Sequence, residues 1–220
     1  MRNIRVVIDK FENLPEDKKK RILDSAIEEF AVNGYDKAST NSIVKKADIS
    51  KGILFHYFGS KKNLFLYLFD YCINTLIDKY YLLDDIEAED IFERFMRVSI
   101  KKMKVIQDEP LMNKLVFSAI TNMPKDLKEE LTVRHNNYTS KYLPEFFEKV
   151  DTTNFKEGID SQKAIELMMM CMDGLSSKYI QRYKDVSMDE VMNNYDEIME
   201  DFNKYLDILK FGIYKSGESK

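Results

Sequence analysis

Residues that interrupt helices are scarce in this sequence. Its 220 residues include 7 glycines and 4 prolines. Because glycine and proline are the strongest helix breakers, so few of them over this length predict long helices.

Cysteine is also scarce. Cys72 and Cys171 lie within apolar helical patterns, and neither belongs to a Cys-x-x-Cys pair or a Cys/His cluster. We interpret both as reduced core residues of a cytoplasmic protein, since cytosolic thiols stay reduced. A redox-sensing pair is the alternative interpretation.

Long apolar runs and the motifs of common enzymes are absent. No run approaches the roughly 18–20 apolar residues of a membrane span, and the first residues lack a signal-peptide core. The sequence has no Gly-rich phosphate loop, nucleophile–base pair or cluster of metal ligands, and its two histidines, His56 and His135, are far apart in the chain. We therefore expect no membrane contact, metal, cofactor or enzymatic activity.

The charge of the chain is uneven. Residues 1–65 hold 13 Lys/Arg and 9 Asp/Glu, a net charge of +4. The remaining 155 residues hold 21 Lys/Arg and 29 Asp/Glu, a net charge of −8. A basic N-terminal part on an acidic body suits a protein that meets nucleic acid at one end.

The stretch STNSIVKKADISKGILFHYFGSKK, which begins at Ser39, predicts two short helices joined by a tight turn. The first helix is expected over 40–47, with Ser39 or Thr40 as its N-cap. The second is expected over 51–58, with Ser50 as its N-cap.

The two sides of the second helix differ in character. Leu54 and Phe58, four residues apart, face the core. The other side carries polar and aromatic residues, namely Lys51, Gly52, Phe55, His56 and Tyr57. In a helix-turn-helix, the second helix lies in the DNA major groove. Six lysines against one acid over residues 37–62 suit contact with phosphates.

Residues 20–68 resemble the N-terminal DNA-binding domain of the TetR family of bacterial transcriptional regulators. The similarity rests on RILDSAIEEFAVNGYDKAST and on IVKKADISKGILFHYFGSKKNLF, whose run ISKG-x-L-F-x-Y-F-x-SK-x-x-L is highly specific to that family. The resemblance implies an all-α fold of about nine helices. It implies an N-terminal arm and helix-turn-helix domain over 1–62, a helical effector-binding and dimerisation domain over 63–214, and a tail over 215–220.

The resemblance also implies which residues approach double-stranded DNA. The matching positions are Ser39, Thr40, Asn41, Ser50, Lys51, Gly52, Phe55, His56, Tyr57 and Lys61. Tyr57 matches a phosphate-contacting aromatic residue, Gly52 the point of closest backbone approach, and Lys61 a backbone clamp. Phe55 stands where many relatives carry tyrosine, which leaves contact with a thymine methyl in place of a hydroxyl contact. In the alternative interpretation these side chains only pack.

Apolar residues spaced by three and four predict the remaining helices, over 16–33, 60–82, 88–107, 111–122, 124–150, 161–183 and 186–212. In the first, residues 18–21, Glu28 and Glu29 are expected in solvent, and Gly34 is expected to end it with a left-handed backbone. Pro144 is expected to kink or divide its helix. The segment before residue 16 is expected to be a loosely ordered tail rather than a DNA contact through Arg2 or Arg5, and Phe11, Leu14 and Pro15 offer it an apolar seat on the first helix.

The chain after residue 90 is rich in methionine and aromatic residues, which suit a cavity for apolar ligands. Ordinary helix core is the alternative. The resemblance implies a pocket between helices 60–82 and 161–183, and the candidate lining residues are Phe95, Met103, Val116, Phe117, Ile120, Tyr138 and Tyr142. Helices 161–183 and 186–212 are expected to form a homodimer interface, with a monomer as the alternative.

These patterns together predict a ligand-responsive DNA-binding transcriptional regulator. We expect a repressor that a small apolar or amphipathic effector releases from a palindromic operator. Two alternatives stay open: a helical carrier or enzyme that does not use its helix-turn-helix, and a TetR-like activator without a small effector. The former would show no salt-sensitive DNA binding.

Overall fold

The structure of the chain, a computed structural model, describes residues 10–80, 89–92, 94, 97, 105–106, 108–147, 150–183 and 193–213. The chain forms two compact units. Unit 1 comprises Met1–Asp84 and Ile100–Phe147, and unit 2 comprises Asp85–Ser99 and Glu148–Lys220. Unit 1 thus groups several later helices with the helix-turn-helix, and the predicted domain boundary after residue 62 stays a prediction.

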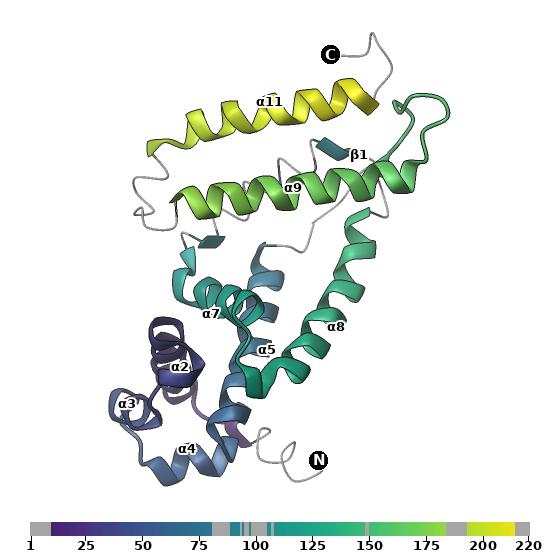
Figure 1. Cartoon of the computed structure of the whole chain (residues 1–220). Coiled ribbons are helices and arrows are strands. Elements are labelled where there is room, and N and C mark those ends of the chain that lie inside the picture. Colours follow the sequence, from purple (N-terminus) through teal and green to yellow (C-terminus); the bar gives the residue numbers. More distant parts are fainter. Residues whose placement is uncertain are drawn as a thin grey trace. The chain divides into compact units, whose positions relative to one another are not determined.

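Unit 1 is a bundle of helices (Figure 1). Its elements are α2 (Glu16–Lys37), α3 (Thr40–Lys46), α4 (Lys51–Phe58), α5 (Lys61–Tyr80), α7 (Pro110–Thr121), the 3-10 turn η1 (Lys125–Leu127) and α8 (Lys128–Phe147). Helix α5 packs against α2, α4, α7 and α8. The helices predicted over 40–47, 51–58 and 111–122 are confirmed to within two residues at each end. The helix predicted over 60–82 is confirmed from Lys61 through Tyr80, the last residue described there.

Local capping explains where the short helices begin. The Ser39 Oγ accepts a hydrogen bond from the Ser42 N–H at 3.4 Å, and the Ser50 Oγ accepts one from the Ile53 N–H at 3.3 Å. Each hydroxyl satisfies a backbone donor that the first helical turn leaves unpaired. Gly59 ends α4 with a φ of 71°, a backbone conformation that glycine adopts without steric cost.

Gly34 interrupts its helix as expected, and Pro144 does not divide its helix. Gly34 has the expected positive φ of 68°, but the chain resumes a helical course after this kink and α2 reaches Lys37. Helix α8 continues through Pro144 to Phe147, so Pro144 does not divide it.

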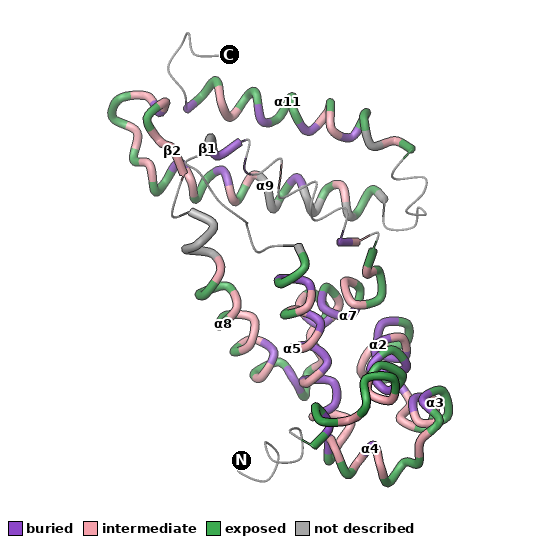
Figure 2. The backbone as a smooth tube through the Cα atoms, turned by 180° about the vertical axis from the view of Figure 1, so that it is seen from behind, coloured by how far each residue is buried: buried purple, intermediate pink, exposed green. Residues whose placement is uncertain are grey.

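The core of unit 1 contains the predicted apolar faces (Figure 2). Its fully buried side chains include Ile22, Ala26, Ile43, Ala47, Leu64, Leu68, Phe69 and Cys72. Each large apolar side chain taken from water contributes about 1.5–3 kcal/mol. Burial also raises the pKa of the Cys72 thiol to about 12, which keeps it protonated and fits its interpretation as a core residue.

Unit 2 is built on two long helices that lie side by side, α9 (Ser161–Tyr183) and α11 (Tyr195–Ile213) (Figure 1). The Tyr179 hydroxyl of α9 donates to Asp201 Oδ2 of α11 at 2.6 Å, and Lys178 Nζ donates to the Tyr205 hydroxyl at 2.9 Å. The predicted start of this helix at 161 is confirmed, and the residues up to Tyr183 are helical as expected.

A small strand pair was not predicted. Strand β1 (Glu89–Asp90) pairs in parallel with β2 (Val150–Asp151), so the helix expected over 88–107 does not start at 88. Most of that helix lies outside the described residues, although the fully buried Ile91 and Arg94 belong to it. Among the described residues, no helix meets the length and hydropathy of a membrane span, and no three His, Cys, Asp or Glu side chains group as metal ligands.

Candidate DNA interface

Helix α4 presents different side chains to the core and to solvent. Leu54 and Phe58 are buried, at 1% and 2% exposure. Lys51, Gly52 and His56 are exposed. A β-carbon added to Gly52 would have one neighbour within 4 Å, the Ser50 Oγ at 3.8 Å. The backbone at Gly52 is therefore open to close approach by another molecule.

The two aromatic residues of this outer edge are half-buried. The Lys51 Nζ lies 5.9 Å from the centroid of the Phe55 ring. The Tyr57 ring meets the Phe11 ring edge-on at 5.7 Å between centroids. Tyr57 therefore has one side in the protein and another toward solvent.

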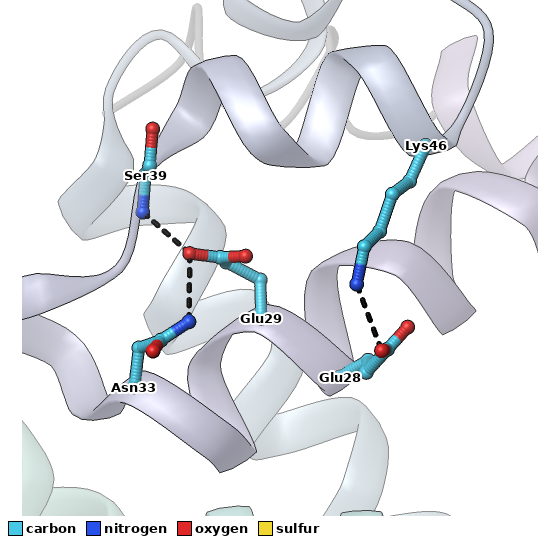
Figure 3. Close-up of polar contacts among 5 residues, drawn as sticks. All are labelled: Glu28, Glu29, Asn33, Ser39 and Lys46. Atoms are coloured by element: carbon cyan, nitrogen blue, oxygen red, sulfur yellow. Dashed lines mark hydrogen bonds and ion pairs between the residues drawn. The ribbon is translucent and has the colours of Figure 1, made fainter.

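The start of α3 is tied to α2 by a buried carboxylate (Figure 3). Glu29 Oε1 accepts hydrogen bonds from the Ser39 N–H at 2.9 Å and from Asn33 Nδ2 at 3.0 Å. The prediction that Glu29 lies in solvent is wrong, since its exposure is 6%. Its place four residues after the buried Ser25, on the stripe that continues from Ile22, was the signal available in the sequence.

The polar groups of Ser39 are consequently used within the protein. Its N–H is donated to Glu29 and its hydroxyl accepts from Ser42. Thr40 is half-buried and Asn41 is exposed. Of these three predicted contacts, Asn41 presents its side chain most openly.

Removing the Glu29 carboxylate should destabilise the fold. We expect Glu29→Ala to lower the free energy of unfolding by about 1–3 kcal/mol, because the Ser39 N–H and the Asn33 amide lose their acceptor in a buried site. Glu28→Ala is the matched control, since Glu28 pairs with Lys46 at 2.8 Å on the surface and such pairs contribute about 0–1 kcal/mol. Urea unfolding measures both, and equal losses would contradict the structural role of Glu29.

The predicted clamp Lys61 has partners inside unit 1. Its Nζ donates to the Asp36 carbonyl oxygen at 3.1 Å and lies 4.9 Å from the centroid of the Tyr35 ring. A lysine ammonium carries three donors, so this contact leaves Lys61 capable of further hydrogen bonds. It also fixes the first turn of α5 to the end of α2.

An open groove that the sequence did not indicate lies beside the start of α4. Its volume is about 570 Å³, and it is lined by Lys18, Arg21, Val44, Lys45, Asp48, Ile49, Ser50 and Ile53. Lys18 and Arg21 were expected to lie in solvent, and no shared surface with α3 or α4 was predicted for them. The fold brings these α2 cations to the same surface as Lys45 and Ser50.

Five of the residues predicted to line a ligand pocket lie on α7 and α8 of unit 1. On α7, Val116 is buried, Ile120 is half-buried and Phe117 is 45% exposed. On α8, the half-buried Tyr138 and Tyr142 stack at 6.4 Å between centroids. The remaining two predicted residues, Phe95 and Met103, lie outside the described residues.

Helix α8 is attached to α5 by aromatic and ionic contacts. The Tyr138 ring meets Phe69 edge-on at 6.5 Å between centroids, and burial raises the pKa of Tyr138 to about 12. The Arg134 Nε pairs with Asp70 Oδ2 at 2.9 Å. A separate cavity of about 220 Å³ borders α2, α5 and α7, and none of the five predicted pocket residues that the structure describes is among its lining residues.

Helices α9 and α11 expose large apolar side chains. The exposure is 51% for Leu167 and 69% for Met170 on α9, and 70% for Ile208 and 81% for Phe211 on α11. Buried Phe202 and Leu206 on α11 contribute to the core of unit 2. Helix α11 thus has one apolar face inside the unit and further apolar side chains outside it.

These features define a helical DNA-binding protein of the helix-turn-helix class. Residues 22–68 match the family described as bacterial regulatory proteins, tetR family. Residues 87–214 match the tetracyclin repressor-like C-terminal domain. The chain belongs to the TetR family and is a DNA-binding transcriptional regulator, which confirms the predicted resemblance and the all-α fold.

Individual relatives are distant. The negative transcriptional regulator IcaR of the icaADBC biofilm operon of Staphylococcus aureus is 25% identical over 146 residues, which cover 60% of this chain and 77% of IcaR. A TetR family regulator from Chloroflexus aurantiacus has a TM-score of 0.63 at 21% identity, covering 94% of this chain and 98% of its own. FadR of Bacillus subtilis, solved in complex with stearoyl-CoA, has a TM-score of 0.54 at 18% identity, with coverages of 82% and 95%.

Proposed function

We propose that this protein is a homodimeric repressor in the bacterial cytoplasm, whose two α4 helices read a palindromic operator. The observation that carries the proposal is the outer edge of α4, where Lys51, Gly52 and His56 are exposed above the buried Leu54 and Phe58. A short helix with this polarity suits insertion into a major groove, about 12 Å wide.

Phosphate contacts would surround the base contacts. Asn41 and Thr40 at the start of α3 and Ser50 before α4 offer polar groups beside helix N-termini, which favour anions. Lys18 and Arg21, which share a groove with Ser50, add cations along the same surface. We infer that the duplex backbone runs past this groove.

The dimer would form through α9 and α11. Their exposed Leu167, Met170, Ile208 and Phe211 supply apolar surface of the kind that a two-fold interface buries. A two-fold axis would repeat α4 on a second subunit. Operator half-sites are then expected roughly one helical turn, about 34–36 Å, or slightly more apart.

We propose a small apolar or amphipathic effector that releases the operator. FadR of Bacillus subtilis was solved in complex with stearoyl-CoA, which supports an acyl compound as the first class of effector to test. IcaR is a negative regulator, which supports repression. Helix α5 is suited to carry the signal, because it contacts α4, α7 and α8. A coupling of about 1–3 kcal/mol would weaken DNA binding about 5–150-fold.

Replacing Lys51 should weaken DNA binding for all sequences. We expect Lys51→Ala to lower affinity about tenfold and to reduce the slope of log affinity against log salt by about one, because one phosphate contact is lost. Fluorescence anisotropy would measure binding to a duplex selected on the wild-type protein from a random library. Lys114→Ala, which removes an exposed lysine of α7 outside both proposed interfaces, is the control, and an unchanged salt slope in Lys51→Ala would count against this contact.

Transcription in vitro from a promoter that contains the selected duplex tests whether the protein represses or activates transcription. A repressor lowers transcript yield, and stearoyl-CoA or another effector restores it. A higher yield would favour an activator. Absence of sequence-selective, salt-sensitive binding would favour a helical carrier or enzyme.

A further inference from the structure

The segment before α2 contributes a buried aromatic side chain to the region of the recognition helix. We call residues Lys10–Leu14 the strap. The strap precedes the part of the chain that matches the TetR family, which starts at residue 22. Its Phe11 is 0% exposed and is among the largest fully buried side chains described. The Leu14 N–H donates to the Phe11 carbonyl oxygen at 3.1 Å, which closes a turn.

Phe11 lies within a cluster of four aromatic rings. Its ring centroid is 4.8 Å from that of Phe58, 5.7 Å from that of Tyr57 and 5.6 Å from that of Tyr67. The Phe58 and Tyr67 rings are 5.3 Å apart. The aromatic contacts of the strap are therefore with the end of α4 and the start of α5, although we expected the segment to rest on the first helix.

Polar contacts join the strap to both α5 and α2. The Tyr67 hydroxyl of α5 donates to Glu12 Oε1. Glu12 Oε2 pairs with Lys19 Nζ of α2 at 3.6 Å, and the same ammonium pairs with Glu16 at 2.8 Å. Burial and the Glu12 contact raise the pKa of Tyr67, so this hydroxyl stays protonated and remains a donor.

Helix α4 needs such support because it has eight residues. A helix this short is unstable by itself and takes its geometry from tertiary packing. Its own buried side chains are Leu54 and Phe58. Phe11 packs directly against Phe58 and against Tyr57, the residue predicted to contact phosphate.

We propose that the strap positions the recognition helix for DNA, with Phe11 fixing the last turn of α4 and the direction of the Tyr57 ring. This inference rests on the proposed reading of DNA by α4. It assigns a positioning role to residues that need not touch the duplex. Substitution of Phe11 should then weaken DNA binding by more than the accompanying loss of fold stability would explain.

The central variant is Phe11→Leu, which keeps an apolar side chain but loses three ring contacts. We expect its affinity for the selected duplex to fall about tenfold, which corresponds to one or two aromatic pairs. The matched control is Phe30→Leu. Phe30 is also buried, but its ring contacts are with Tyr35 and Phe65, away from α4.

The experiment compares wild type, Phe11→Leu and Phe30→Leu in the full chain. Anisotropy gives affinity for the selected duplex and for a shuffled duplex, at a temperature well below every Tm measured by circular dichroism. Hydrogen exchange of the α4 amides reports local order. We expect Phe11→Leu to lose selective affinity and protection in α4, and Phe30→Leu to keep both despite a similar fall in Tm.

Equal affinity of wild type and Phe11→Leu, or losses in both variants that simply follow Tm, would overturn the positioning role alone. A wild type that does not prefer the selected duplex over the shuffled one would overturn the proposed DNA reading, and this inference with it. If Phe11→Leu does not fold, Tyr67→Phe decides, because it keeps the ring and removes the bond to Glu12. We expect about threefold weaker binding from that variant, and unchanged binding would overturn the proposal.

Discussion

Gly52→Ala is expected to make the protein more stable and its DNA complex weaker. Gly52 lies in the first turn of α4 and is exposed, with only the Ser50 Oγ near the position of an added β-carbon. Alanine therefore fits the free protein. It should raise the free energy of unfolding by about 0.5–1 kcal/mol, because glycine loses more backbone entropy on folding.

The same methyl group should obstruct DNA. If the backbone at Gly52 approaches the duplex closely, an added methyl separates the surfaces and disturbs the contacts of Lys51 and Ser50. We expect at least about a tenfold loss of affinity, or about 1.4 kcal/mol, when thermal unfolding and anisotropy are measured on the same samples. Asn136→Ala on the exposed face of α8 is the control, since it should gain about 0.5 kcal/mol in stability with unchanged binding. Unchanged binding by Gly52→Ala would place the closest approach elsewhere.

The double variant Ile208→Glu/Phe211→Glu is expected to be monomeric and to lose the operator. Both side chains are mostly exposed on α11, so the charges should leave the core of unit 2 intact. A buried, unpaired carboxylate is strongly unfavourable in an interface. Loss of the second α4 removes the gain from bivalent binding, and affinity should fall about 100-fold or more.

Sedimentation velocity and anisotropy together test this expectation. Val133→Glu is the matched control, because Val133 is an exposed apolar residue of α8 in unit 1. It should leave both the assembly state and the affinity unchanged. A double variant that stays dimeric would exclude this part of α11 from the interface, and a monomer with full affinity would contradict the two-fold reading of DNA.

The helix ends that neighbouring residues determine could be predicted most closely from the sequence. The bounds of α4 follow from Ser50 at its start and Gly59 at its end, and both residues act as expected. Helix α9 begins after Asp160, whose Oδ1 accepts from the Lys163 N–H at 3.1 Å. Such caps involve residues within one turn, so they can be read directly from the chain.

Contacts between distant segments could not be predicted in this way. The burial of Glu29 depends on the Ser39 N–H, which the kink at Gly34 brings back toward α2. The pairing of Glu89 with Val150 joins segments that no local pattern links. Phe11 was named only as an apolar seat on the first helix, because its ring contacts with Tyr57, Phe58 and Tyr67 depend on how α4 meets α5.

For the same reason, the two candidate sites could be predicted from the sequence to different extents. The outer edge of α4 comes from one helix with a fixed period, so exposure of Lys51, Gly52 and His56 could be predicted. The roles of these residues on DNA stay predictions. A ligand pocket is assembled from several helices, and the predicted residues Phe117 and Tyr138 belong to two of them, α7 and α8, whose packing no local pattern fixes. Their binding role also stays a prediction.

Hydroxyl-radical footprinting of the wild-type protein on its selected duplex tests the central claim most directly. If α4 reads DNA beside a symmetry-related copy, two protected patches should appear, related by a two-fold axis and centred roughly one helical turn or slightly more apart. The protection should fade as salt rises and should be lost in Gly52→Ala at the same protein concentration. A single protected patch, or protection that Gly52→Ala leaves intact, would contradict the claim.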